Sequence, residues 1–427
     1  MNQPNIIVIT ADGLRWDSLG CSGNPDVRTP NIDALASHGL QFTQAFSACP
    51  HACSGAHTFL TGAVPTTFDP ELPAASPGAE PLILPGRLRS AGYVTAAVGA
   101  LDLPGERLEE SFDFVEALGC PGQVDAYQAW LAAEGHATED DEEVSGAPLL
   151  QEALHPTTWA GNEAVRLARS IAEPFFLWVS LPRPRWPLDP PVPWKHMYRP
   201  SRLQLPAGSL FMPLDPDLDI ADSRDRAGRS EAEFRRVLTA WYGSISHVDR
   251  QIGRLLATLT ARGRTNNMFA VTSGRGEYLG YRGLLNTMPG PLYEPLTHVP
   301  LIIGGVPNQR RGRMDSALVS TGDLVPTLLE VLQLETVTPG GSRSLNAHLR
   351  EEGLPHRRAV VLLADDGGGL RSARYKWLVE GNGQRERLFD LQADPLERHN
   401  LHGERQSPAI RKMLLASLGS GAVEPQR

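Results

Sequence analysis

The apolar positions of this chain fall into short continuous runs, separated by longer stretches with a helical period. The first run, Asn5–Thr10, reads NIIVIT and is rich in β-branched residues. Unbroken runs of this kind are typical of strands that are buried on both faces of a parallel sheet. Four later runs have the same character: Tyr93–Val98, Phe175–Ser180, Met268–Thr272 and Val299–Ile303.

Between these runs, apolar residues recur at spacings of three and four, which is the period of an amphipathic helix. The clearest helix is predicted over residues 231–262 and stops at Gly263. Its apolar stripe consists of Phe234, Leu238, Trp241, Ile245, Val248, Ile252, Leu255 and Leu259. A shorter helix is predicted to start at a Thr29-Pro30 cap and to end at Gly39. Alternating strands and helices predict a doubly wound sheet, in which ligands bind at the carboxyl ends of strands.

The pattern changes after about residue 350. Short strands are predicted there, with a Gly-rich turn at Asp366–Gly369. The strands are Ala359–Leu363, Tyr375–Val379 and Arg387–Leu391. The predicted fold class is therefore α/β, with a large, doubly wound, mixed but mostly parallel sheet flanked by helices. We expect one domain over residues 1–350 and a small C-terminal α+β subdomain with an antiparallel sheet over 351–427.

Composition and charge exclude several classes of partner. The 427 residues are 41% hydrophobic and carry 40 Lys and Arg against 49 Asp and Glu, a net charge of −9. A mildly acidic chain without a basic tract argues against nucleic acid and membrane surfaces as partners. No apolar run approaches the about 18 residues of a membrane span, and Met1–Asn5 lacks the features of an export signal. Four irregularly spaced cysteines predict no disulfide framework, so we expect a cytoplasmic location.

The most informative segment follows the fourth predicted strand. Residues 271–280 read VTSGRGEYLG, and Asp12–Gly20 after the first strand read DGLRWDSLG. Thr29–Ser47 (TPNIDALASHGLQFTQAFS) and Leu388–Leu401 (LFDLQADPLERHNL) are further distinctive stretches. In this order and spacing, the chain resembles the sulfatase family of the alkaline phosphatase superfamily over nearly its whole length. The resemblance implies an alkaline phosphatase-like fold and the hydrolysis of sulfuric esters.

The resemblance also implies that most metal ligands of that family are missing. It places one ligand pair at positions 12 and 13, and a second pair, an Asp followed by Asn or His, at 274 and 275. This chain has Asp12 and Gly13 at the first pair and Gly274 and Arg275 at the second. Asp12 is the single surviving ligand position. Because hard cations such as calcium need about six oxygen ligands, we expect no bound cofactor.

The nucleophile pattern of the family, Cys-x-Pro-Ser-Arg, is matched imperfectly. The chain reads CSGAH from Cys53 to His57, without the Pro and the Arg, so oxidation of the Cys to formylglycine is not expected. The loop before Thr61 is one residue short, and Ala52 is therefore an equal candidate for the nucleophile position. Cys53 and His57 are interpreted as vestigial catalytic residues. A buried Cys and a capping or surface His are the simpler alternatives.

The groups that contact the transferred sulfate in the family are replaced as well. Its Gly-Lys-Trp-His string corresponds to GALD at Gly99–Asp102, its Asp-Pro-His to RPR at Arg183–Arg185, and its late Lys to the region of Thr287. Stabilisation of developing charge is often the largest catalytic contribution, and one donor is worth roughly 3–4 kcal/mol. Losing several donors together predicts rates close to that of the uncatalysed reaction.

Three of the replacements are charged and suggest a rebuilt pocket. Arg275 is predicted to reach Asp12 and to supply the positive charge that the cation supplies in the family. Arg185 and Asp102 are predicted to form a salt bridge. Two outcomes stay open: Arg185, Arg275 and Asp102 form an anion-binding site, or they fill the cavity and the function lies on the outer surface.

Other polar residues of the family-like strings are interpreted as structural. Arg15 and Asp17 are predicted to pair and to fix the loop after the first strand. Glu277 and Glu294 are predicted to accept hydrogen bonds from the backbone.

The function predicted from these features is that of a sulfatase-like pseudoenzyme with a binding or assembly role. The alternative is an active sulfuric or phosphoric ester hydrolase with altered machinery, which would bind calcium. A sulfated or phosphorylated small molecule or sugar is the expected ligand. Assembly with itself or with a related chain is a further possibility.

Overall fold

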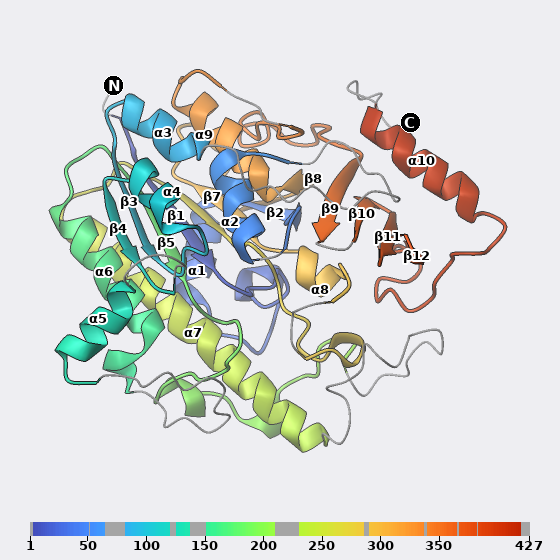
Figure 1. Ribbon diagram of the computed structural model, residues 1–427, viewed down its shortest axis with the longest axis horizontal. Coiled ribbons are helices and arrows are strands. Elements are labelled where there is room, and N and C mark those ends of the chain that lie inside the picture. Colours follow the sequence, from blue (N-terminus) through green and yellow to red (C-terminus); the bar gives the residue numbers. More distant parts are fainter. Residues whose placement is uncertain are drawn as a thin grey trace.

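The architecture was analysed in a computed structural model. It describes residues 3–50, 52–64, 82–119, 125–136, 151–209, 230–285, 290–336, 340–364, 367–381 and 383–419. These residues form two sheets with helices around them (Figure 1). Within these described ranges, no helix is both long enough and apolar enough to cross a lipid bilayer.

A mixed sheet of eight strands forms the centre of the molecule. In spatial order its strands are β4 (Phe114–Ala117), β3 (Val94–Gly99), β5 (Phe175–Leu181), β1 (Asn5–Ala11), β6 (Asn267–Thr272), β7 (Leu301–Gly304), β2 (Gly39–Phe46) and β8 (Arg313–Ser320). The strands from β4 to β6 are mutually parallel, β7 is antiparallel to both neighbours, and β8 is parallel to β2. The predicted α/β class with a mixed, mostly parallel sheet is confirmed.

Strand β1 lies inside the sheet because both of its faces are apolar. The side chains of Ile7 and Ile9 enter the core on one face, and those of Ile6 and Val8 enter the core on the other. All four are at most 1% exposed. The unbroken apolar run near the start of the chain thus reflects helices on both sides of the strand.

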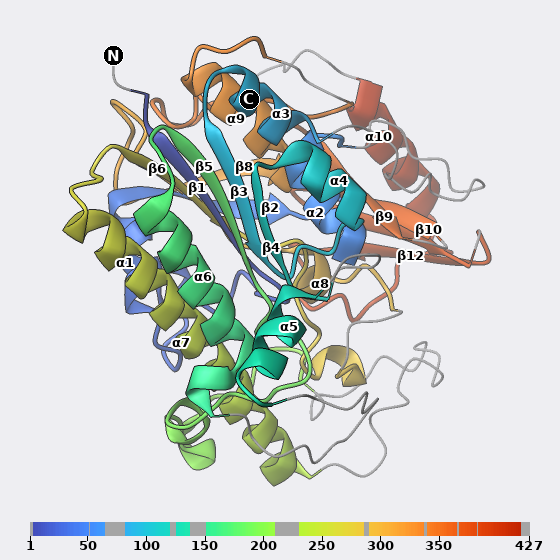
Figure 2. The ribbon, with the colours of Figure 1, turned by 60° about the vertical axis from the view of Figure 1, so that its left-hand side comes forward.

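Helices cover both faces of the sheet (Figure 2). On one face lie α1 (Pro30–His38), α6 (Pro156–Ser170) and α7 (Glu231–Ala261). On the other lie α2 (Ala52–Thr61), α3 (Ile83–Ser90) and α9 (Leu324–Val331). The shorter helices α4 (Gly105–Ser111) and α5 (Ala126–Ala133) lie near β4.

The long helix α7 confirms the prediction for residues 231–262. Ser230 starts it with a capping box, in which its Oγ accepts from the Glu233 backbone and the Glu233 carboxylate accepts from the Ser230 backbone. Helix α1 begins with Pro30 after Thr29 and stops at Gly39, as predicted, but the Thr29 side chain does not cap it. Its hydroxyl donates to Asp33 Oδ1 at 2.9 Å and accepts from the backbone of Gly20, and it caps no N–H of α1.

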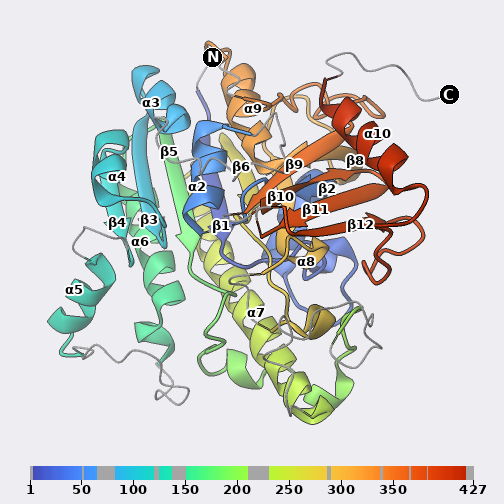
Figure 3. The ribbon, with the colours of Figure 1, turned by 45° about the vertical axis from the view of Figure 1, so that its right-hand side comes forward.

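A small antiparallel sheet forms the C-terminal part, as predicted, and lies beside the large sheet (Figure 3). Its spatial order is β12 (Arg385–Asp390), β11 (Tyr375–Glu380), β10 (Gly367–Ser372) and β9 (Ala359–Ala364). Helix α10 (Ser407–Gly419) covers it through Ile410 and Leu414, which pack with Leu370 and Trp377. The predicted domain division at residue 350 stays a prediction.

The predicted turn at Asp366–Gly369 is wrong. Asp366 lies outside the described residues, and the glycines that follow it belong to strand β10. A Cβ at Gly367 would collide with the carbonyl oxygen of Val379, and one at Gly369 would lie 2.5 Å from that of Trp377. These glycines allow β11 to approach closely. A run of three glycines more often indicates a turn, but glycine in a strand can also mark a place where another backbone comes close.

A buried ion cluster joins the small sheet to α8 (Glu294–Thr297). Lys376 Nζ lies 3.1 Å from Glu294 Oε1 and 3.0 Å from Glu397 Oε1, and the side chains of Lys376 and Glu397 are 0% exposed. Arg371 Nη2 approaches Glu294 Oε2 at 3.2 Å. The prediction that Glu294 accepts from the backbone is therefore wrong, because cationic side chains from β10 and β11 take up its oxygens.

Candidate functional site

Four parallel strands bring the predicted site residues to one edge of the large sheet. β3, β5, β1 and β6 are consecutive neighbours, so their carboxyl ends lie together. Asp12 follows β1, Arg275 follows β6, Arg185 follows β5 and Asp102 follows β3. The topology alone thus collects in one place residues that are far apart in the chain.

Both oxygens of Asp12 are held by guanidinium groups. Arg275 Nε donates to Asp12 Oδ1 at 2.9 Å, and Arg275 Nη2 donates to Oδ2 at 3.3 Å. Arg185 Nη1 donates to the same Oδ2 at 2.9 Å. The side chains of Asp12 and Arg275 are 11% and 8% exposed, whereas that of Arg185 is 28% exposed. The predicted approach of Arg275 to Asp12 is present.

The backbone around these side chains is held by short-range bonds. The N–H of Arg185 donates to the carbonyl oxygen of Asp12 at 2.8 Å, which fixes the loop after β5 against the loop after β1. The hydroxyl of Ser273 lies 2.8 Å from the carbonyl oxygen of Ala11 and accepts from the N–H of Arg275 at 3.3 Å. Ser273 thereby positions Arg275. This role was not predicted, because the family pattern concerns positions 274 and 275 and not Ser273.

Asp102 lies at the outer side of this group. Its Oδ2 is 3.9 Å from Arg185 Nη1, so the predicted salt bridge is present but long. Its φ of 49° is in the left-handed region, which is uncommon for a residue other than glycine. Burial and the nearby charge of Asp12 raise the pKa of Asp102 to about 6.

The charges of the four side chains nearly cancel at neutral pH. Burial opposes ionisation of Asp12, but the charges of Arg275 and Arg185 outweigh it, and the pKa of Asp12 is lowered. Asp12 is therefore anionic and Asp102 is mostly anionic at pH 7, opposite two arginines. Protonation of Asp102 below pH 6 leaves the group with a net positive charge.

The residues at the family's metal position do not fit a calcium ion. Calcium takes about six to eight oxygen ligands, and both oxygens of Asp12 already accept from arginines. Gly13 has a φ of 84°, and a Cβ there would lie 3.1 Å from the backbone of Arg185, so a ligand side chain would be strained. Among the residues that the structure describes, no group of three or more His, Cys, Asp or Glu could hold a metal ion.

Helix α2 approaches the same edge of the sheet. A Cβ at Gly55 would lie 2.7 Å from the carbonyl oxygen of Gly274, so the first turn of α2 packs against the loop that carries Arg275. Cys53 and His57 belong to this helix, but their side chains lie outside the described residues, as does Thr287. The vestigial catalytic role of Cys53 and His57 stays a prediction.

Arg15 ties the loops after β1 and β6 together. It binds Asp17 through two bonds of 2.9 and 2.6 Å, and its Nη1 donates to the carbonyl oxygens of Glu277 and Tyr278 at 3.3 and 3.1 Å. The predicted structural pair of Arg15 and Asp17 is present. The hydrogen bonds from Arg15 to the loop after β6 were not predicted, because no sequence pattern indicates them.

Glu277 is a buried carboxyl next to the site. Its Oε1 accepts from the N–H of Tyr278 at 3.2 Å, as predicted, but its Oε2 has no hydrogen-bond partner among the described residues. Burial raises the pKa of Glu277 to about 8, although the charge of Arg275 opposes the shift. Glu277 is therefore largely protonated at neutral pH.

This carboxyl predicts a pH-dependent effect of Glu277→Gln. The folded protein keeps a proton that the unfolded chain loses near pH 4.5, so the stabilisation is complete below that pH and is lost as the pH rises through 8. Glutamine does not titrate. Relative to the parent chain, the variant should gain on the order of 4 kcal/mol in the free energy of unfolding between pH 5 and pH 8.5. Urea unfolding at both pH values measures this.

The exposed Glu106 offers a matched control for that measurement. Glu106→Gln should show the same stability difference from the parent chain at both pH values. A Glu277→Gln variant that behaves in the same way would mean that Glu277 is charged in the folded protein.

Comparisons with known proteins agree with the fold and with the motifs. A family model described as "Sulfatase" matches residues 4–334. An arylsulfatase of Clostridium perfringens is 27% identical, over 97% of this chain and 94% of its own length. The crystal structure of a phosphonate monoester hydrolase of Agrobacterium radiobacter superposes with a TM-score of 0.81 at 23% identity, covering 98% of this chain and 96% of that one. A structure of a protein in complex with its substrate D-glucosamine-2-N,6-O-disulfate gives a TM-score of 0.76 at 20% identity, covering 98% and 97%.

These comparisons bear differently on fold and on activity. The solved structures are less than 25% identical and therefore show the fold alone. The names of the relatives favour the alternative that the chain hydrolyses an ester, and they do not support the predicted loss of activity. The departures from the family's site pattern at Gly13, Gly274, Arg275, Arg185 and Asp102 stay predictions from this chain's own sequence.

Proposed function

Because this chain belongs to the sulfatase family, we propose that it has kept the family's anion pocket but recognises its ligand with arginine side chains and without a divalent cation. In this proposal the chain binds a sulfated or phosphorylated small molecule or sugar and does not hydrolyse it by the metal-dependent route. The observation that carries the proposal is the saturation of both Asp12 oxygens by Arg275 and Arg185.

Arg185 is the group through which an anion would bind. Its Nη1 contacts Asp12, while its Nε and Nη2 have no hydrogen-bond partner among the described residues. A guanidinium with free donors can bind two oxygens of a sulfate or phosphate group at once. Arg275 is more deeply buried and serves mainly to neutralise Asp12.

The second candidate is an active ester hydrolase. It is favoured by the names of the relatives, which match nearly the whole chain, and by the position of α2 beside Gly274. Such an enzyme would need a cation or another electrophile at the Asp12 edge, and its ligands would have to come from residues outside the family pattern.

Metal dependence and hydrolysis separate the two candidates. We expect the thermal unfolding midpoint of the purified chain to be unchanged by 1 mM CaCl2 or by EDTA at about that concentration, with no stoichiometric divalent cation by elemental analysis. We also expect hydrolysis of 4-nitrophenyl sulfate to stay at background. Hydrolysis well above background that Asp12→Ala abolishes would establish the second candidate instead.

Binding of glucosamine 6-sulfate, measured by titration calorimetry, tests the anion pocket. Arg185→Met should abolish it, and Arg236→Met, which removes an exposed arginine of α7, should not. Because the pKa of Asp102 is raised to about 6 by burial and by Asp12, binding should be stronger at pH 5 than at pH 7.5. Equal binding by both arginine variants would place the ligand elsewhere.

A further inference from the structure

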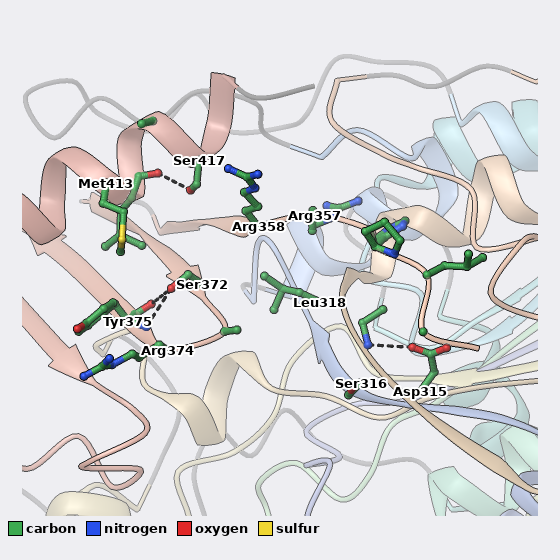
Figure 4. A pocket seen from close by; sticks show the side chains of 18 of the residues that line it. Asp315, Ser316, Leu318, Arg357, Arg358, Ser372, Arg374, Tyr375, Met413 and Ser417 are labelled. Atoms are coloured by element: carbon green, nitrogen blue, oxygen red, sulfur yellow. Dashed lines mark hydrogen bonds between the residues drawn. The ribbon is translucent and has the colours of Figure 1, made fainter. Parts of the chain in front are cut away.

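A large groove lies between the edge of the eight-stranded sheet and the C-terminal part of the chain (Figure 4). Its walls are the strand β8, the loop 352–358, the turn between β10 and β11, and the helix α10. Its volume is about 1250 Å³, whereas pockets for small molecules usually measure roughly 300–1,000 Å³. The groove is therefore large enough for a segment of polypeptide.

The first half of β8 is an open sheet edge. Among the described residues, β8 is the outermost strand and pairs with β2 alone. Leu318, in its second half, is covered because it packs with Val360 and Leu362 of β9. Met314 and Ser316, in the first half, are exposed and line the groove. Unpaired backbone groups at such an edge are a template for another strand.

Exposed thioether side chains stand on two walls of the groove. Met314 of β8 is 55% exposed, and Met413 of α10 is 48% exposed. The flexible, polarizable side chain of methionine adapts to the shape of a partner. Apolar contact is therefore available on either side of the open edge.

The groove also contains a cation for which the described residues provide no counterion. Arg357 pairs with Asp323, and Arg374 pairs with Asp390 at 2.7 Å. Arg358 has no ion-pair or hydrogen-bond partner in the part of the chain that the structure describes, and it extends into the space between α10 and Leu318 (Figure 4).

The acidic side chains of the groove do not neutralise Arg358. Asp315 and Glu352 both pair with Arg310, each at 3.3 Å. The groove therefore presents a free positive charge between two apolar contacts.

We propose that this groove binds an extended peptide segment with both carboxylate and aliphatic side chains, which adds as a strand to the open edge of β8. Backbone bonds to β8 would provide affinity, and side chains that face the groove would meet Arg358 and the methionines on its walls. The complementarity of charge selects an acidic segment over a basic one. This function is independent of the anion pocket at Asp12, none of whose residues lines the groove.

A fluorescein-labelled peptide, acetyl-Glu-Val-Glu-Leu-Glu-Val-amide, tests the proposal by fluorescence anisotropy with the full chain. We expect saturable binding, at least tenfold weaker binding by Arg358→Glu, and no effect of Arg236→Glu, which reverses an exposed charge on α7. Ser316→Pro should also weaken binding by at least tenfold, because proline blocks the addition of a strand. If this variant unfolds, Met314→Lys replaces it, with the same expected loss.

Three outcomes would overturn the proposal. The first is equal binding of a peptide in which Lys replaces each Glu. The second is binding that Arg358→Glu leaves unchanged. The third is the absence of peptide binding at millimolar peptide concentration. This outcome overturns the proposal also where sedimentation shows that a second copy of the chain covers the groove.

Discussion

Replacing Asp12 with alanine is expected to lower the free energy of unfolding by about 3 kcal/mol. The reason is that Arg275 is 8% exposed and would keep its charge without the carboxylate that now receives two of its hydrogen bonds. Removing one partner of a buried ion pair typically costs roughly 3–5 kcal/mol, because it leaves an uncompensated charge. We take the lower end because Arg185 is partly exposed and can turn towards water. Chemical denaturation of the purified variant measures the loss.

A double-mutant cycle is the control for this prediction. Arg275→Met alone should also destabilise, since Asp12 then loses its more buried partner, whereas the double variant Asp12→Ala/Arg275→Met should recover part of the loss. If Asp12 were a calcium ligand instead, EDTA would destabilise the parent chain as much as Asp12→Ala does. An Asp12→Ala variant that is more stable than its parent would contradict the ion-pair interpretation.

Replacing Lys376 with methionine should have an effect at least as large. Lys376 is 0% exposed and lies 3.1 Å from Glu294 and 3.0 Å from Glu397, so its removal leaves two buried carboxylates with one fewer cation. We expect a loss of about 3–5 kcal/mol in the free energy of unfolding, measured in urea at pH 7.5. The loss should be smaller at pH 5, because burial already raises the pKa of Glu397 and a protonated carboxyl needs no counterion.

The exposed pair of Arg87 and Glu335 provides the comparison for Lys376. Their side chains are 42% and 78% exposed at a separation of 2.9 Å, and exposed pairs contribute roughly 0–1 kcal/mol. Arg87→Met should therefore change stability little. A Lys376→Met variant that also changes stability little would show that water reaches the cluster and replaces the ammonium group.

Much of the fold was predictable because its strands are apolar on both faces. Asn5–Thr10 and Phe175–Ser180 lack polar interruptions and were identified within one residue of β1 and β5. Gly39–Phe46 and Arg313–Ser320 were missed because they carry polar residues and lie towards an edge of the sheet. The glycines of β10 were misassigned because their role depends on how closely β11 approaches.

The sequence by itself determined the family and the order of the main strands along the chain, since these depend on local patterns and spacing. The approach of Arg275 to Asp12 was predicted, but only the tertiary structure decided that Arg185, 173 positions from Asp12, binds the same carboxylate. It also decided that Lys376 lies against Glu294. Such contacts join different strands and loops. Their distances follow from the packing of the whole sheet and not from any one segment. The proposals for the Asp12 pocket and for the groove beside β8 both rest on contacts of this second kind.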